Sequence, residues 1–160
     1  MSISSNDIMP VDRDAVVAPG ATIRLEAPNG VCYGIFCDRE YPWLVPVAEN
    51  VQRLLWYEKN WDSHGAQPLN PNAVQEAFSI LCRVMTDEHQ APRLSPTPSG
   101  GLQMEWRIPK ALMQVEVDYD GSISAYLSDT RSGAELDWED ESIEEIDLLK
   151  EKLSTLKDAA

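Results

Sequence analysis

The stretch from Leu102 to Leu127 constrains the fold more than any other part of this chain. Apolar residues occupy every second position in three consecutive segments, LQMEWRI, LMQVEVDY and SISAYLS. A period of two is typical of strands with one buried face, because successive side chains point to opposite sides. Asp120-Gly121 is a strong hairpin-turn signal, so the sequence predicts a three-stranded antiparallel meander. The residues predicted for its buried face are Leu102, Met104, Trp106, Ile108, Met113, Val115, Val117, Tyr119, Ile123, Ala125 and Leu127.

A hairpin and two helices are predicted before the meander. ATIRLEA and VCYGIFC, separated by the turn signal PNG, indicate two strands over residues 21–37. The apolar spacing then predicts a helix from Pro46 to Lys59. A second helix should begin after the N-cap Asn70, with Pro71 at its first position, and end between residues 86 and 88.

A third helix is predicted at the C-terminus. Ser142 to Glu145 matches a capping box, and an apolar stripe follows at helical spacing. The predicted fold is α+β, with the meander and the N-terminal hairpin packed against two or three helices. Residues 1–20 are expected to form an irregular arm, and residues 21–160 a single domain. The stripe consists of Ile143, Ile146, Leu149, Leu153 and Leu156.

The three cysteines, Cys32, Cys37 and Cys82, lack the spacing of a disulfide framework. They are therefore expected to be reduced and mostly buried. The N-terminus shows no signal-peptide pattern, and no apolar run approaches the roughly 20 residues of a membrane span. These features together predict a cytoplasmic protein.

Negative charge is concentrated in the second half of the chain. The formal net charge is −14, and Gly101–Leu149 contains thirteen acidic and three basic residues, which gives −10. Such a surface repels phosphate, so direct nucleic-acid or anionic-membrane binding is disfavoured, whereas a basic protein partner is compatible with it. The predicted partner-binding residues are Glu135, Asp137, Trp138, Glu139, Asp140, Glu141, Glu144 and Glu145. Trp138 is either a core anchor or an exposed aromatic contact on this surface.

Patterns that would indicate catalysis are weak. Asp62-Ser63-His64 places three catalytic residue types side by side, but adjacent side chains diverge, and catalytic triads are usually assembled from distant segments. A helix–turn–helix joint explains this segment better, with Asp62 or Ser63 bonded to local amides and Gly65 at positive φ. The two histidines, His64 and His89, form no metal-binding pair. No cofactor, metal or catalytic residue is predicted.

Three stretches carry a resemblance to known proteins. NWDSHGAQPLNPNAVQEA, followed by PTPSGGLQMEW and DYDGSI, resembles a loosely defined group of small bacterial proteins that share NWDxxGA…P and PTPxGGxQxEW. The similarity covers roughly residues 60–127, about two-fifths of the chain. It implies a bacterial or phage origin and a shared unit of helix and sheet, and it brings no activity with it.

These observations predict a non-enzymatic, acidic protein-interaction module that docks on a basic partner protein. Inhibitors of nucleic-acid enzymes, such as anti-CRISPR, anti-restriction and antitoxin-like proteins, often carry such a charge because it can occupy a groove built for phosphate. Two other classes stay open. One is a small hydrolase or metal-dependent enzyme that uses carboxylates with His64 or His89, and the other is a structural subunit of a larger complex. The sequence does not indicate an oligomeric state.

Overall fold

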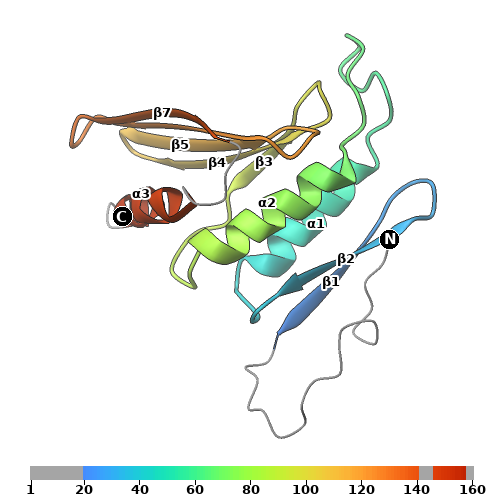
Figure 1. The fold of residues 1–160 in the computed structure, drawn as a ribbon, viewed down its shortest axis with the longest axis horizontal. Helices are drawn as coiled ribbons and strands as arrows, with labels where there is room; N and C mark the ends of the chain where they lie inside the picture. The colour runs from blue at the N-terminus through green and yellow to red at the C-terminus, as the bar shows by residue number, and fades with distance from the viewer. Residues whose placement is uncertain (1–19, 141–145, 158–160) are drawn as a thin grey trace, which may run out of the picture.

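The computed structural model describes residues 20–140 and 146–157, which form three helices, a two-stranded sheet and a five-stranded sheet. Helices α1 (Leu44–Leu55) and α2 (Pro71–Val84) lie between the two sheets, and α3 (Ile146–Lys157) lies against the same side of the larger sheet (Figure 1). The predicted α+β class is confirmed. Apart from Gly20, the predicted N-terminal arm lies outside the described residues.

The larger sheet is antiparallel, with its strands side by side in chain order. The predicted meander forms its three central strands, and its buried face is confirmed except at two positions. Ile108 is only partly buried, and Tyr119 lies beyond the strand with 52% of its surface exposed. The strands are β3 (Arg93–Pro96), β4 (Leu102–Ile108), β5 (Ala111–Val117), β6 (Ile123–Asp129) and β7 (Ala134–Asp140).

The smaller sheet is the predicted hairpin of β1 (Ala21–Glu26) and β2 (Cys32–Cys37), and it packs against α1 and α2. A disulfide joins Cys37 to Cys82 on α2. The prediction that all the cysteines are reduced is therefore wrong for this pair, while Cys32 is free and partly buried. Cys37 faces α2 because strand alternation places it on the inner side of the hairpin, together with the buried Ile35.

Helix α1 differs from its predicted limits at both ends. It begins at Leu44, so Pro46 is its third residue, and it ends at Leu55 instead of Lys59. The amide of Tyr57 donates to the carbonyl of Leu54, a tightened last turn after which the chain leaves the helix. The apolar spacing predicts which side of α1 is buried. It does not determine where the helix begins and ends, because helix ends depend on local hydrogen bonding.

Helix α2 begins as predicted. The Asn70 side chain accepts a hydrogen bond from the amide of Asn72, and Pro71 occupies the first turn. The helix ends at Val84, two residues before the predicted limit, because Met85 is extended.

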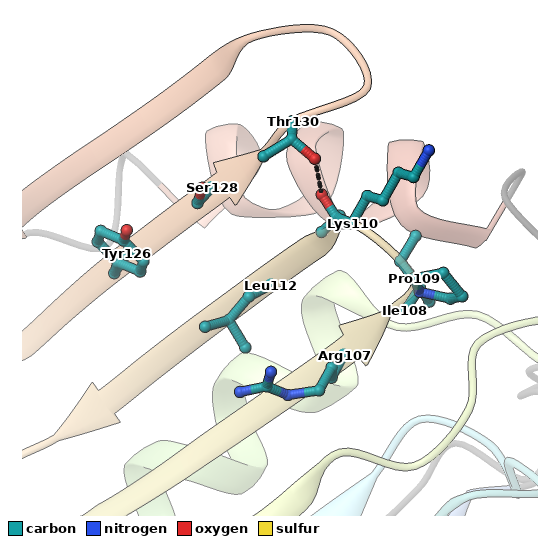
Figure 2. Close-up of a pocket in the computed structure, with 9 residues that line it drawn as sticks. Arg107, Ile108, Pro109, Lys110, Leu112, Tyr126, Ser128 and Thr130 are labelled. Atoms are coloured by element: carbon teal, nitrogen blue, oxygen red, sulfur yellow. Dashed lines mark hydrogen bonds between the residues drawn. The ribbon is translucent and has the colours of Figure 1, made fainter.

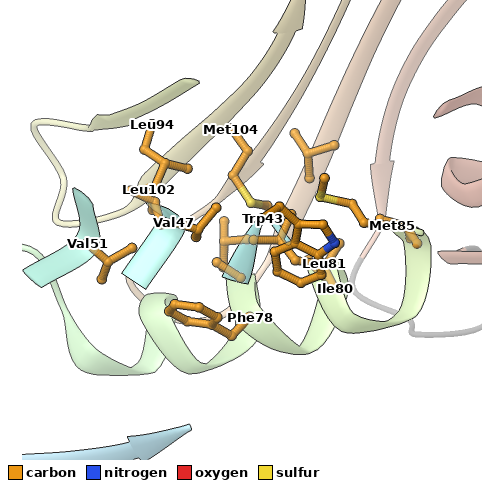
Figure 3. Close-up of a cluster of buried hydrophobic side chains, with 14 of the residues drawn as sticks. Trp43, Val47, Val51, Phe78, Ile80, Leu81, Met85, Leu94, Leu102 and Met104 are labelled. Carbon is orange, nitrogen blue, oxygen red and sulfur yellow. The ribbon is translucent and has the colours of Figure 1, made fainter. Parts of the chain in front are cut away.

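The core joins the helical layer to the inner face of the larger sheet. Side chains of α1, α2 and strands β3 and β4 belong to one buried cluster, and Figure 3 labels Val47, Leu81 and Met104 among its members. The predicted stripe of α3 is confirmed for its last four members, each of which is at most 3% exposed. Burying one such side chain contributes about 2 kcal/mol. Ile143 and the predicted capping box at residues 142–145 lie outside the described residues.

Candidate interaction surface

The side of the larger sheet that faces away from the helices is open in the described part of the protein (Figure 1). Strands β5, β6 and β7 contain no Lys or Arg. Their outward positions alternate with the buried ones, so acidic and uncharged polar groups gather on this side. We call these outward positions of β5–β7 the open face.

Tyr126 lies at the centre of the open face, and 45% of its surface is exposed. The strand register places it opposite Gln114 of β5 on one side and Asp137 of β7 on the other. The next row places Ser128 opposite Glu135. Directly opposed residues in a sheet are close neighbours, so the aromatic ring has carboxylates beside it along β7.

The polar groups of the open face make few bonds of their own. The hydroxyl of Tyr126 and the carboxylates of Glu116, Glu135 and Asp137 form no hydrogen bond or ion pair with any other described residue. Burial raises the pKa of Glu116, and the nearby negative charge of Asp118 raises it further. These groups remain available to a partner, and a cation that approached Glu116 would reverse part of that pKa shift.

Positive charge borders the open face at one end. A shallow concavity of about 620 Å³ lies next to Tyr126 and includes Arg107, Lys110, Leu112 and Ser128 in its lining (Figure 2). None of the residues that line it is acidic. The surface is therefore polarised, with carboxylates along β7 and Lys110 at the turn between β4 and β5, while Arg107 near the end of β4 is paired with Glu105.

The turn at this end has an unusual backbone conformation. Lys110 has a φ of 67°, a left-handed conformation that favours glycine. Both the amide and the hydroxyl of Thr130 donate to the carbonyl of Lys110, each at 2.9 Å, and so hold the turn against the end of β6 (Figure 2). A basic side chain is thus placed where glycine would fit with less strain.

The predicted partner-binding residues that the structure describes lie on strand β7 and not at the start of α3. Glu135 and Asp137 are exposed on the edge strand β7. Trp138, Glu139 and Asp140 also belong to β7, where their backbones pair with Ala125, Ser124 and Ile123. The alternatives for the Trp138 side chain stay open. Glu141, Glu144 and Glu145 lie outside the described residues.

Sequence reasoning missed Tyr126 as a surface residue of interest. The signal was present in the alternation, since the apolar positions of SISAYLS are Ile123, Ala125 and Leu127, which places Tyr126 on the opposite side. A large aromatic residue on the polar side of an amphipathic strand is the type of group that anchors protein contacts.

The Asp62-Ser63-His64 segment forms the joint that was expected. One carboxylate oxygen of Asp62 accepts from the amides of His64 at 2.8 Å and Ala66 at 3.0 Å, and the first of these bonds is the main cause of the lowered pKa of Asp62. Gly65 has a φ of 84°. The indole of Trp61 donates to the carbonyl of Gln67 at 3.0 Å. The segment uses its polar groups to hold its own turn.

The first two of the stretches that carry the resemblance contact each other. The amide of Gln67 donates to the carbonyl of Pro98, and that of Asn70 to the carbonyl of Gly100. A Cβ atom on Gly100 would lie 3.1 Å from the Pro68 carbonyl oxygen, and one on Gly101 would lie 2.4 Å from a neighbouring strand's carbonyl oxygen. Close packing therefore gives both motifs a structural role.

Two properties of the described residues bear on function. No group of three or more His, Cys, Asp or Glu side chains converges as a metal site among residues 20–140 and 146–157. Among the same residues, no helix combines the length and apolarity needed to cross a membrane.

No protein-family model, curated protein or solved structure matches this chain. The resemblance through NWDxxGA…P and PTPxGGxQxEW therefore stays a prediction.

Proposed function

We propose that this protein is a non-enzymatic interaction module whose open face docks on a basic surface of a partner protein. The observation that carries the proposal is the exposed, unbonded Tyr126 among carboxylates on three strands that lack Lys and Arg. An aromatic side chain at an interface buries apolar area against the partner. The carboxylates complement a basic surface and speed its association with the protein.

A basic protein fits this face better than a nucleic acid does. Nucleic-acid affinity depends on cations that neutralise phosphates, and the open face offers carboxylates in their place. Partners with a basic groove of their own include nucleic-acid enzymes. The proposed subclass is therefore an inhibitor of the anti-CRISPR, anti-restriction or antitoxin kind, in a bacterial or phage setting.

The proposed location is the cytoplasm. Disulfides are rare there because thiol reductants keep cysteines reduced. A cytoplasmic protein would therefore have to keep its fold with Cys37 and Cys82 as thiols. Alkylating the thiols in intact cells before lysis would show whether that pair is reduced in its native setting.

Matched charge variants test the docking surface. Tyr126→Ala with Glu135→Gln and Asp137→Asn removes the anchor and two charges, whereas Glu49→Gln with Glu58→Gln removes two charges from exposed positions elsewhere. Each protein is immobilised, exposed to bacterial lysate at low salt and eluted with rising salt, and the retained proteins are quantified. We expect basic proteins retained by the wild type and the control to be lost from the open-face variant.

Two results would contradict the proposal. Retention of the same proteins by both variants would mean that net charge alone is responsible. Retention of no basic protein by the wild type would remove the open face as a docking surface. Circular dichroism of each variant establishes that the fold is intact before the comparison is made.

A further inference from the structure

The two cysteines of the Cys37–Cys82 disulfide differ in exposure. Cys37 is only 1% exposed, because it lies on the inner side of the β1–β2 hairpin. Cys82 is partly exposed and lies in the last turn of α2. A thiolate opens a disulfide by attacking one of its two sulfurs, and access is one of the factors that decide which sulfur is attacked. Cys82 is therefore the end of this bond that a reagent in solution meets first.

A concavity of about 450 Å³ extends to Cys82. It lies between β2 and α2, and Cys82 is part of its lining whereas Cys37 is not. Two exposed residues of α2, Gln75 and Ser79, border it on one side, and the exposed Phe36 of β2 borders it on the other. Sites for small molecules typically have volumes of roughly 300–1,000 Å³. The concavity thus has room for a small thiol beside the disulfide.

The charge of the lining does not select among small thiols. It contains one cation, Arg83, and one carboxylate, Asp38, which offset each other. The choice of a thiol comes from the disulfide itself, because thiolates react with disulfides by exchange.

The carboxylate affects the sulfur that is released. Cys37 Sγ lies 4.0 Å from Asp38 Oδ1, which also accepts a hydrogen bond from the Tyr41 hydroxyl at 3.0 Å. Once the disulfide is opened, the Cys37 thiol can donate to this oxygen. The negative charge disfavours the Cys37 thiolate, and it therefore slows both the opening of the bond and its re-formation. A mixed disulfide on Cys82 should consequently persist once it has formed.

We propose that Cys82 is a modification site for a low-molecular-weight thiol. The incoming thiolate attacks Cys82 Sγ, a new S–S bond forms, and the bond between Cys82 Sγ and Cys37 Sγ breaks. The electron pair of the broken bond stays on Cys37 Sγ, which takes a proton from water, so the number of disulfide bonds is unchanged. The product carries a mixed disulfide in the concavity, and its hairpin is no longer covalently attached to α2. The site does not involve the open face and does not depend on the proposed docking function.

Reduced glutathione is a suitable probe, used on the whole Cys32→Ser protein so that the free cysteine of β2 does not react. The folded protein is incubated with glutathione at neutral pH for a limited time, quenched with acid, unfolded and alkylated with N-ethylmaleimide. Peptide mass spectrometry then locates the two adducts. We expect glutathione on Cys82 and maleimide on Cys37, with at least about tenfold less of the reverse arrangement, because Cys37 is inaccessible.

A plug variant tests whether the concavity is the route to Cys82. Ser79 is exposed and lies one turn before Cys82 on the same side of α2, so Ser79→Trp covers the sulfur without altering a buried residue. It should slow the modification about tenfold by blocking access. The control Asn72→Trp, at an exposed position of α2 outside the concavity, should react like the parent protein. Circular dichroism establishes that each variant is folded, and Gln75→Trp on the same wall replaces Ser79→Trp if the latter does not fold.

Three results would overturn the proposal. The first is glutathione on Cys37 in an amount equal to or above that on Cys82. The second is modification of the folded plug variant at the rate of the Asn72→Trp control. The third is the absence of the mixed disulfide from the folded protein, with glutathione reacting only after the chain has been unfolded in urea.

Discussion

Reducing the Cys37–Cys82 disulfide should destabilise the protein strongly, because the bond closes a long loop. The two cysteines lie 45 residues apart and connect β2 to α2. In the loop-closure description, a crosslink of that span removes about 13 cal/mol/K of entropy from the unfolded chain, or about 4 kcal/mol at 25 °C. Since single domains are stable by only about 5–15 kcal/mol, this is a large share of the free energy of unfolding.

Urea unfolding followed by circular dichroism, with and without a reductant, measures the effect. Reduction is cleaner than substitution, because Cys37 is only 1% exposed and a serine there would place an additional polar group in the core. With a urea dependence of about 2 kcal/mol per molar, the midpoint should fall by about 2 M. The Cys32→Ser variant, which leaves the pair intact, should show the same fall.

Two outcomes would refute this reasoning. One is an identical urea midpoint in the oxidised and reduced protein. The other is the labelling of three thiols, instead of one, when the unreduced protein is unfolded and treated with a maleimide. Either result would mean that the hairpin is held on α2 by packing alone, and the objection to a cytoplasmic location would then disappear.

Three further changes test the turns of the larger sheet by chemical denaturation. Gly101→Ala should cost about 3 kcal/mol, because the new Cβ would lie 2.4 Å from the Val117 carbonyl oxygen; an unchanged midpoint would contradict that packing. Lys110→Gly should stabilise by about 0.5–1 kcal/mol, since relief of the left-handed strain exceeds the entropy cost of glycine; a loss of stability would show that the turn is not strained. The hydrogen bond from Arg131 lowers the pKa of Asp129 to about 2. Because the folded-state pKa lies below the unfolded one, this stabilisation is present above about pH 4 and is lost as the pH falls toward 2. The fall in stability between pH 4 and pH 2 should therefore be shallower in Asp129→Asn than in the wild type, and equal slopes would count against the bond.

The central strands could be predicted from sequence because their signals are local. Alternation over β4–β6 and the Asp120-Gly121 turn specify both the strands and their connection, and Gly121 indeed has a φ of 87°. The start of α2 was predictable for the same reason, since Asn70 caps the helix through its own side chain. In the central strands and at the start of α2, the residues that determine the local structure lie within a few positions of the element that they determine.

Strand β7 was missed because its local signals conflict. The segment AELDWED alternates apolar and acidic residues, but carboxylates are depleted in strands, and the acidic content drew attention to charge instead. The segment forms a strand because it pairs with β6 over seven residues, and that pairing is a tertiary interaction. The Cys37–Cys82 contact was missed for a similar reason, since no local pattern brings β2 onto α2.

Polar groups in the loop around Asp62 have hydrogen-bond partners, whereas several on the larger sheet have none among the described residues. This difference favours a functional site on the sheet over one in the loop. Asp62 accepts two backbone amides, and Asn60 accepts a third from Gly65 at 2.7 Å, so the loop's acceptors are occupied in holding its shape. Tyr126 and Asp137 have no such bonds within the described residues, although their backbones are paired in the sheet. Cross-strand contacts of Tyr126 with its neighbours contribute at most about 1 kcal/mol to the stability of the sheet, and they leave its hydroxyl and the Asp137 carboxylate without hydrogen-bond partners among the described residues. We propose contact with a second molecule as the role of this pair.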